Sequence, residues 1–396
     1  MLDSPFVRLA DYEDSLSIHS DLRICLVIEA VGGGAGRHVL DLAKTLHMRG
    51  HDVHLIYSPR RAEPRHLAEI AALPITSEPL AMRRAPGLHD VAAARALAAT
   101  LRRAGPFDIV HGHSSKAGAL VRLADVGPAK RVYTPHAFRG LDRSASLPAR
   151  LAFNGAEIVL GAARTDALIA VSSGELAFAR KLRIATGRCH LIRNGVIDIP
   201  AVARAQARAA LGLPDDAPVI GFVGRLSYQK APERFVAAMR RAMPQVPDLR
   251  AVLVGDGEHA DAVARDLAAS GFADRFIWRR TAKAQELMPA FDAVMMTSRY
   301  EGLSYVLLES LAAYVPIVTT DVAGARDVIG GSRCGLIVPN DATVIDRLAE
   351  AAILIGTDRK ARAAMAAATA GRSREMNGMR MIYQTEMLYR RLRDAR

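Results

Sequence analysis

Two glutamates flank a short turn that leads into an apolar helix. Glu301 and Glu309 have seven residues between them, and Gly302, Leu303 and Ser304 follow the first glutamate directly. The turn comes just after an apolar strand, so the first turn of the helix would present free backbone N–H groups to an anion. The carboxylates would accept hydrogen bonds from sugar and ribose hydroxyls. The alternative is a pair of surface glutamates, but the apolar neighbours of Glu309 indicate a buried helix, where an unpartnered carboxylate is costly.

Basic residues follow a glycine at the end of another predicted strand. Gly224 and Arg225 end this strand, and Lys230 stands near the start of the next helix. A guanidinium binds two oxygen atoms in a fork, and an ammonium adds a compact charge, so the pair suits a diphosphate. Exposed basic residues with no ligand are the alternative.

A glycine-rich loop follows the first predicted strand at residues 32–36. Glycine allows backbone N–H groups to approach a ligand closely, and Gly34 stands in the middle of this loop. A dinucleotide fingerprint is excluded, because Arg37 stands where its last glycine belongs and the second strand ends without an acidic residue. A tight turn with no ligand remains the alternative.

Two further strand ends in the first half carry polar residues. His111, His113, Ser115 and Lys116 form one cluster, and His136 follows a proline in the other. No third ligand stands at useful spacing near the two close histidines, so we expect no metal site there. We expect His113, Ser115 and Lys116 to bind an acceptor. His136 could orient an acceptor, position a leaving group or be a structural histidine.

These groups lie at the ends of apolar strands that alternate with helix-length segments, which predicts mostly parallel sheets covered on both faces. The fold class is therefore α/β, with two Rossmann-like, doubly wound domains that face a cleft. Strands are predicted at residues 22–30, 51–57, 107–112, 131–136 and 167–172 in the first half, and at residues 218–226, 249–257, 275–280, 292–298, 316–321 and 334–339 in the second.

The alternation breaks at residues 194–214, where turn signals, a polar helix and prolines stand together. The predicted organisation is an N-terminal extension at 1–20, a first domain at 21–198, a second domain at 199–371 and a helical tail at 372–396. We expect the tail to cross back to the first domain.

The chain of 396 residues has a net charge of +12, which would attract nucleic acid, anionic lipid or a polyphosphate ligand. Aromatic residues make up only 5%, and no basic block is interleaved with them, which argues against nucleic acid. Arg83, Arg84, Arg102 and Arg103 flank an alanine-rich helix, so contact with an anionic membrane would be electrostatic and weakened by salt.

We expect neither a transmembrane helix nor a signal peptide, because the chain has no long apolar run and its start lacks a basic, apolar leader. Cys25, Cys189 and Cys334 are unpatterned and suit reduced, mostly buried thiols. A cytoplasmic location follows as the expectation, with the inner face of the cytoplasmic membrane as the alternative.

With these motifs in this order, the sequence resembles glycosyltransferase family 4, the retaining GT-B "group 1" transferases. The resemblance runs over nearly the whole chain from Leu22, and the Glu-x₇-Glu element is its most specific part. It rests on the segments GGGAGRHV, VHGHSSKAG, YTPHAF, LIAVSSGE, IRNGV, GFVGRL, LVGDGE and YEGLSYVLLESLA.

The resemblance implies a first domain that binds the acceptor and a second that binds a UDP- or GDP-sugar, with no required cofactor or metal. Arg225 and Lys230 would bind the donor diphosphate, and Glu309 the donor ribose. Glu301 would lie near the transferred sugar, and His136 at the reacting centre. Donor-binding residues would also include Gly34, Gly224, Gly302, Leu303 and Ser304.

The implied activity is retaining sugar transfer to a glycan or lipid-linked acceptor in bacterial exopolysaccharide, capsule or lipopolysaccharide biosynthesis. The alternatives are a nucleotide-sugar epimerase on the same fold and a non-catalytic sugar-nucleotide-binding protein. The chain departs from the family where proline often replaces Ser304 or Tyr305, and at residues 322–327. These departures leave the donor open.

Overall fold

The computed structural model describes residues 22–395 except 143, 198 and 282. The predicted extension at 1–20 lies outside the described residues. The chain divides into two compact units. The C-terminal unit is Gly195–Asn377; the N-terminal unit combines the chain up to Asn194 with the final helix from Gly378 onward.

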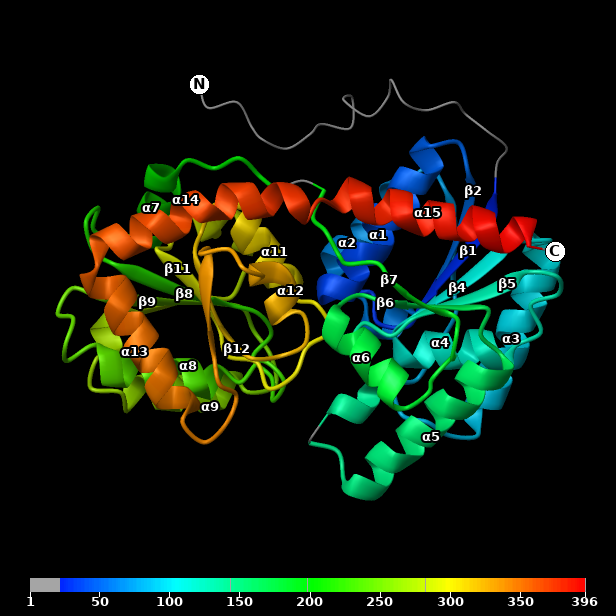
Figure 1. Cartoon of the computed structure of the whole chain (residues 1–396), viewed down its shortest axis with the longest axis horizontal. Helices are drawn as coiled ribbons and strands as arrows, with labels where there is room; N and C mark the ends of the chain where they lie inside the picture. The colour runs from blue at the N-terminus through cyan, green and yellow to red at the C-terminus, as the bar shows by residue number, and fades with distance from the viewer. Residues whose placement is uncertain (1–21, 143, 198, 282, 396) are drawn as a thin grey trace. The chain divides into compact units, whose positions relative to one another are not determined.

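Each unit is built on one parallel sheet with helices on both faces (Figure 1). The strand orders, β3-β2-β1-β4-β5-β6-β7 and β10-β9-β8-β11-β12-β13, both reverse beside the first strand of the unit, as in Rossmann-like domains. The prediction of two such domains is confirmed. The strands are β1 (Arg23–Ile28), β2 (Asp52–Tyr57), β3 (Thr76–Pro79), β4 (Ile109–His113), β5 (Lys130–Thr134), β6 (Ala167–Ala170), β7 (Cys189–Leu191), β8 (Val219–Val223), β9 (Arg250–Val254), β10 (Phe276–Arg279), β11 (Ala293–Met296), β12 (Ile317–Thr320) and β13 (Gly335–Val338).

Several helices, such as α1 and α8, bury an apolar side. Helix α8 begins with Pro232 at its first position, where the missing N–H has no helical partner to lose. Helix α7 ends at Gly212, which adopts a left-handed φ of 67°. The helices are α1 (Gly33–Met48), α2 (Pro64–Ala72), α3 (His89–Ala104), α4 (Ser114–Leu123), α5 (Leu147–Ala163), α6 (Ser173–Lys181), α7 (Arg204–Leu211), α8 (Pro232–Ala242), α9 (Ala260–Ala268), α10 (Ala284–Leu287), α11 (Tyr305–Ala312), α12 (Ala325–Ile329), α13 (Val344–Thr357), α14 (Arg359–Glu375) and α15 (Gly378–Asp394).

The predicted strands all form, and two short strands were missed. Strands β3 and β7 lie at the edges of the N-terminal sheet. Neither has the continuous apolar run of the central strand β1, because an edge strand is only partly covered. No helix in the part of the chain that the structure describes is long and apolar enough to cross a lipid bilayer.

Helix α15 is joined to the N-terminal unit by buried polar contacts. Glu386 of α15 receives hydrogen bonds from Arg49, at 2.5 Å, and from Arg390, at 2.8 Å, and lies 3.2 Å from His51. Tyr389 lies 2.5 Å from Nδ1 of His111 on β4. Helix α15 begins at Gly378 and belongs to the N-terminal unit, whereas α14 belongs to the C-terminal unit.

Glu386 links this helix to the stability of the N-terminal unit. Burial alone would raise its pKa, but hydrogen bonds from His51, Arg49 and Arg390 bring the pKa to about 2, below the ordinary 4.5. A depressed folded-state pKa stabilises the protein above the unfolded value. That stabilisation is lost as pH falls from about 5 to about 2.

We predict that Glu386→Gln lowers the free energy of unfolding of the N-terminal unit by about 3 kcal/mol at pH 7, because buried cations lose their partner. The difference from the unsubstituted protein should shrink as pH falls from about 5 to about 2, because Glu386 takes up its proton in the unfolded chain before it does so in the folded one. Urea unfolding followed by circular dichroism measures both units, while fluorescence of the sole tryptophan, Trp278 in the C-terminal unit, is the internal reference. Asp394→Asn, at an exposed position of the same helix, is the control. An equal loss in both variants would contradict the prediction.

Candidate functional site

The predicted site residues lie at the carboxyl ends of parallel strands in both units. In the C-terminal unit, the loops that follow β8 and β9 approach each other closely. A Cβ atom at Gly255, whose φ is 144°, would lie 2.0 Å from the carbonyl oxygen of Gly224. Glycine is therefore required at Gly255, and the contact fixes the loop that carries Arg225.

Glu301 is buried and accepts hydrogen bonds from several donors. Lys230 Nζ lies 2.6 Å from its Oε1 atom, and the Ser298 hydroxyl donates to the same oxygen over 2.8 Å. The Gln229 amide reaches the other oxygen at 3.3 Å. Lys230 Nζ also lies 3.5 Å from the Ser304 hydroxyl. The structure thus joins three predicted residues, Lys230, Glu301 and Ser304, with Gln229 and Ser298, which sequence reasoning missed.

Arg225 is exposed and follows Gly224, where a Cβ atom would lie 3.5 Å from the Lys230 side chain. Among the described residues no carboxylate pairs with Arg225, whereas Arg299 is bound to Glu233 and stacks on Tyr228. Its guanidinium is therefore available to an anion.

Helix α11 begins at Tyr305, four residues after Glu301. The Ser304 side chain makes no hydrogen bond that caps the helix. Gly302, Leu303 and Ser304 are buried. One turn further, Glu309 is half-buried and accepts a hydrogen bond from the Gln285 amide at 2.7 Å. Glu301 and Glu309 therefore have different hydrogen-bond partners, and each could bind a different group of one ligand.

In the N-terminal unit, the glycine-rich loop starts helix α1. Gly33 adopts a positive φ of 55°, and its N–H donates to Glu63 Oε1 at 2.8 Å. Arg65 binds the other oxygen of Glu63 at 3.0 Å. Glu63 thus places a carboxylate at the helix start beside Gly34, where an anion is favoured. An incoming phosphate would have to displace it to reach Gly33; sequence reasoning missed this residue.

Three histidines meet at the carboxyl end of the same sheet. His38 comes from α1, His113 ends β4 and His136 follows β5. The Nδ1 atom of His113 lies 3.2 Å from Nε2 of His136, and the rings of His38 and His136 have their centroids 4.6 Å apart. Burial lowers the pKa of His38 to about 4, against a hydrogen bond with Asn194, and holds the pKa values of His113 and His136 well below 6.5. The three rings are therefore neutral at pH 7.

His111 has a structural role, because both of its ring nitrogens contact hydroxyl groups of the N-terminal unit. Its Nδ1 lies 2.5 Å from the Tyr389 hydroxyl, and its Nε2 lies 2.8 Å from the Thr134 hydroxyl. Both ring nitrogens are thus used by the fold.

A buried glutamate holds the loop that carries His136. Ser172 and Glu175 form the start of α6, where the Ser172 hydroxyl accepts from the Glu175 N–H. Glu175 accepts from the N–H groups of Val171, at 2.8 Å, and Ala137, at 2.7 Å. Burial raises the pKa of Glu175 to about 7, although both N–H groups oppose the shift. The clamp maintains positive φ values at His136 and Ala137, 51° and 87°.

The predicted acceptor-binding residues differ in how strongly other side chains of the protein already bind them. Lys116 is held by both oxygens of Asp90, each at 2.7 Å, and by the carbonyl of Ala85. Ser115 is half-buried one residue earlier. An acceptor that used the Lys116 charge would have to share it with Asp90.

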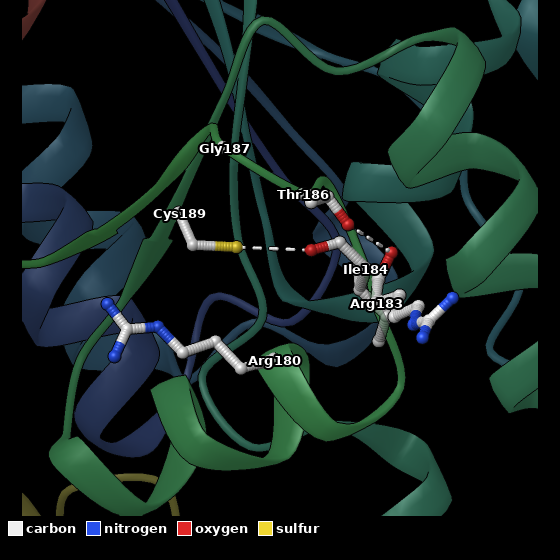
Figure 2. Close-up of a pocket in the computed structure, with 6 residues that line it drawn as sticks. All are labelled: Arg180, Arg183, Ile184, Thr186, Gly187 and Cys189. Atoms are coloured by element: carbon white, nitrogen blue, oxygen red, sulfur yellow. Dashed lines mark hydrogen bonds between the residues drawn. The ribbon is translucent and has the colours of Figure 1, made fainter.

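A separate hollow of about 600 Å³ lies beside α6 and β7 (Figure 2). The Cys189 thiol donates to the carbonyl of Ile184 at 3.1 Å, and burial raises its pKa. The cysteine is half-buried, whereas Cys25 and Cys334 are buried; all three are free thiols. None of the predicted site residues lines this hollow, whose lining is Arg180, Arg183, Ile184, Thr186, Gly187 and Cys189.

We predict that Lys230→Met destabilises the C-terminal unit by about 3 kcal/mol, because Glu301 is left buried without its cation. A second change, Glu301→Gln, should restore part of this loss. Urea unfolding followed by Trp278 fluorescence measures the unit directly. Lys283→Met is the matched control, since this lysine is exposed and pairs only loosely with Glu286. If both lysine variants lower the free energy of unfolding by the same small amount, the prediction is contradicted.

Two protein-family models match the chain. Residues 203–372 match the family model described as glycosyl transferases group 1, and residues 32–198 match the model for glycosyltransferase family 4. D-inositol 3-phosphate glycosyltransferase of Kribbella flavida is 31% identical over 303 residues, which cover 68% of this chain and 67% of that relative. Alpha-maltose-1-phosphate synthase of Mycolicibacterium smegmatis is 29% identical over 400 residues, which cover 91% and 96%.

A solved structure of another protein has the same fold. The crystal structure of Anabaena Alr3699/HepE in complex with UDP and glucose has a TM-score of 0.78 and 19% sequence identity to this chain, over 93% of this chain and 99% of that one. The predicted GT-B fold and the predicted transferase activity are confirmed. The two matched family models together span both α/β units, and the chain belongs to the group 1 glycosyltransferases.

Proposed function

We propose that this glycosyltransferase moves a sugar from a nucleoside-diphosphate sugar, of the UDP or GDP class, to a glycan or lipid-linked acceptor, with retention of the anomeric configuration. The observation that carries the proposal is the segment after β8, which holds both Arg225, an exposed arginine with no carboxylate partner among the described residues, and Lys230, which is bound to Glu301. This segment offers a diphosphate one guanidinium and one ammonium that is shared with Glu301, and Glu301 offers a carboxylate to a sugar. The complex of Anabaena Alr3699/HepE with UDP and glucose supports the same ligand class.

In the proposed reaction, Arg225 and Lys230 stabilise the charge that develops on the departing diphosphate. The bond between C1 of the sugar and the diphosphate oxygen breaks, and a bond from C1 to the acceptor oxygen forms on the same face. The proton of the acceptor hydroxyl passes to the leaving diphosphate. Glu309 binds the ribose hydroxyls and Glu301 the sugar, while the N–H groups at 302–304 bind sugar and phosphate.

The N-terminal unit supplies the acceptor side of the proposal. Gly34 lies near phosphate or acceptor, and His136 orients the reacting groups as a neutral imidazole. His113, Ser115 and Lys116 bind the acceptor. A role in bacterial exopolysaccharide, capsule or lipopolysaccharide assembly suits such a transferase, and family membership favours transfer over epimerisation.

We predict that one nucleoside diphosphate stabilises the protein in a thermal-shift titration with UDP, GDP, ADP, CMP and NAD, each with and without Mg²⁺. A ligand at 100 times its dissociation constant adds about 2.7 kcal/mol. Arg225→Ala should weaken nucleotide binding at least about tenfold, because it removes a guanidinium that binds the diphosphate. The guanidinium pairs with no carboxylate of the described residues, so the change should not unfold the protein.

Arg240→Ala, at an exposed position on α8, is the matched control and should bind nucleotide as the unsubstituted protein does. Stabilisation by NAD alone, or equal affinity in both arginine variants, would contradict the proposed donor site. Once the donor is known, the anomeric configuration of the product, measured by NMR, tests retention.

We also propose a salt-sensitive contact of the N-terminal unit with anionic lipid at the inner face of the cytoplasmic membrane. Arg83 and Arg84 are exposed, and Leu147, Leu151 and Val159 of α5 are each more than half exposed. Vesicles that contain anionic lipid should co-sediment the protein at low salt better than neutral vesicles do. Equal binding to both vesicle types would contradict the contact.

A further inference from the structure

One buried carboxylate joins two loops at the carboxyl end of the N-terminal sheet. Strands β5 and β6 are neighbours in this sheet, and Glu175 lies in the first turn of α6, just after β6. Its Oε1 atom accepts from the N–H of Ala137 at 2.7 Å, and its Oε2 atom accepts from the N–H of Val171 at 2.8 Å. Glu175 therefore ties the loop that carries His136 to the end of β6.

The contact with the His136 loop needs both carboxylate oxygens of Glu175. A glutamine side chain has one accepting oxygen, and it would turn an NH₂ group toward the second backbone N–H. The loop itself is strained, because His136 and Ala137 adopt φ values of 51° and 87° although neither is glycine. Such a backbone keeps its shape only while surrounding contacts hold it. The ionised Glu175 side chain is one of these contacts.

Helix capping alone does not explain the position of Glu175. In a capping box, a glutamate at the third helical position bonds back to the N–H of the N-cap residue of its own helix. The N-cap residue of α6 is Ser172, but Glu175 bonds to Val171 before it and to Ala137 in another loop. The Glu175 side chain is also fully buried, which a helix cap does not require.

The Glu175 carboxylate is costly to bury in its ionised form. Burial raises its pKa to about 7 against the two N–H groups, and Glu157 of α5 raises the pKa further. No cation among the described residues pairs with Glu175, since Arg180 and Lys181 lie in the last turn of α6 and His136 is neutral. A perturbed, buried group of this kind beside a reacting centre points to function.

We propose that Glu175 is a positioning residue of the transfer reaction, whose ionised side chain holds His136 where it orients the reacting groups. This inference rests on the proposed function, which gives His136 that role. A proton on Glu175 turns one accepting oxygen into an O–H donor that faces a backbone N–H. The loop is then released on one side. Because the pKa of Glu175 is about 7, turnover should fall as pH drops below about 7.

NMR of the full chain tests the hold on the loop without any ligand. The sequence has two His–Ala pairs, His136–Ala137 and His259–Ala260. Histidine labelled with ¹³C at its carbonyl and alanine labelled with ¹⁵N give one carbonyl–amide cross-peak for each pair. Glu175→Gln should move the Ala137 peak at about pH 8, because a bond to a charged oxygen is weakened or lost, and should leave the Ala260 peak in place. The Ala137 peak should titrate near pH 7 in the unsubstituted protein only.

Kinetics tests the consequence for the reaction, with UDP-glucose and GDP-mannose as probes and release of the nucleoside diphosphate as the measurement. Glu175→Gln should lower kcat at least about tenfold at about pH 8, because the reacting groups are misplaced. The KM for the donor should change less than about twofold, since the C-terminal unit binds the donor in the proposed function. Asp125→Asn, at an exposed carboxylate of the N-terminal unit, should keep both constants.

The melting temperature separates positioning from a purely structural role. The pKa of Glu175 is about 7 in the folded chain, against 4.5 for an ordinary glutamate, so the unsubstituted protein loses stability as pH rises from about 4.5 to about 7. The melting temperature of Glu175→Gln, relative to that of the unsubstituted protein, should therefore rise over this range. A carboxylate that served only the fold would give a relative melting temperature that falls.

A folded Glu175→Gln variant with the Ala137 peak and the kcat of the unsubstituted protein would overturn the proposal. Circular dichroism shows whether the variant is folded. If it is not, Glu175→Asp replaces it, because this side chain keeps the charge but is too short to reach both loops, and the same fall in kcat is expected. If the unsubstituted protein releases nucleotide from neither probe, the proposed function fails, whereas the Ala137 spectrum still decides whether Glu175 holds the loop.

Discussion

A parallel strand in the centre of a sheet must be covered on both faces, because it has no edge open to water and carries apolar side chains on both sides. In both units this requirement sends helices over both faces and leaves the ends of the strands as the place where polar groups meet solvent. Since the strands run in one direction, their carboxyl ends share one edge of each sheet. Lys230 and Glu301 meet at one such edge, and His113 and His136 meet at the other.

The two edges use charge differently. In the C-terminal unit, the segment after β8 holds the Lys230–Glu301 ion pair and also Arg225, which no carboxylate of the described residues neutralises, so the edge keeps a positive potential for an anionic ligand. In the N-terminal unit, Lys116 is neutralised by Asp90, and Glu63 places a carboxylate at the start of α1. Its strand ends are otherwise lined by uncharged imidazoles, which suit ligands that hydrogen-bond without charge.

The alternation of strands and helices could be predicted from the sequence because central strands are continuous apolar runs. The edge strands β3 and β7 could not, since partial exposure removes that signal. Among site residues, Glu301 and Lys230 could be found because their types and positions after strands point to anion and sugar binding. Gln229, Ser298, Glu63 and Glu175 could not, because a hydrogen bond between distant residues leaves no spacing pattern. His38 was missed for the same reason: it reaches His136 only through the fold.

The position of α15 affects how the chain is completed during synthesis. The ribosome makes the N-terminal sheet before the C-terminal unit, yet the helix that carries Glu386 and Tyr389 emerges only after the whole of the C-terminal unit. Until then the apolar side of α15, with Met381, Ile382 and Leu388, is missing from the N-terminal core. The half that is made first is therefore the last to become complete, and it needs protection from aggregation in the interval. For the same reason, loss of α15 damages a unit whose other strands and helices all come before the C-terminal unit in the sequence.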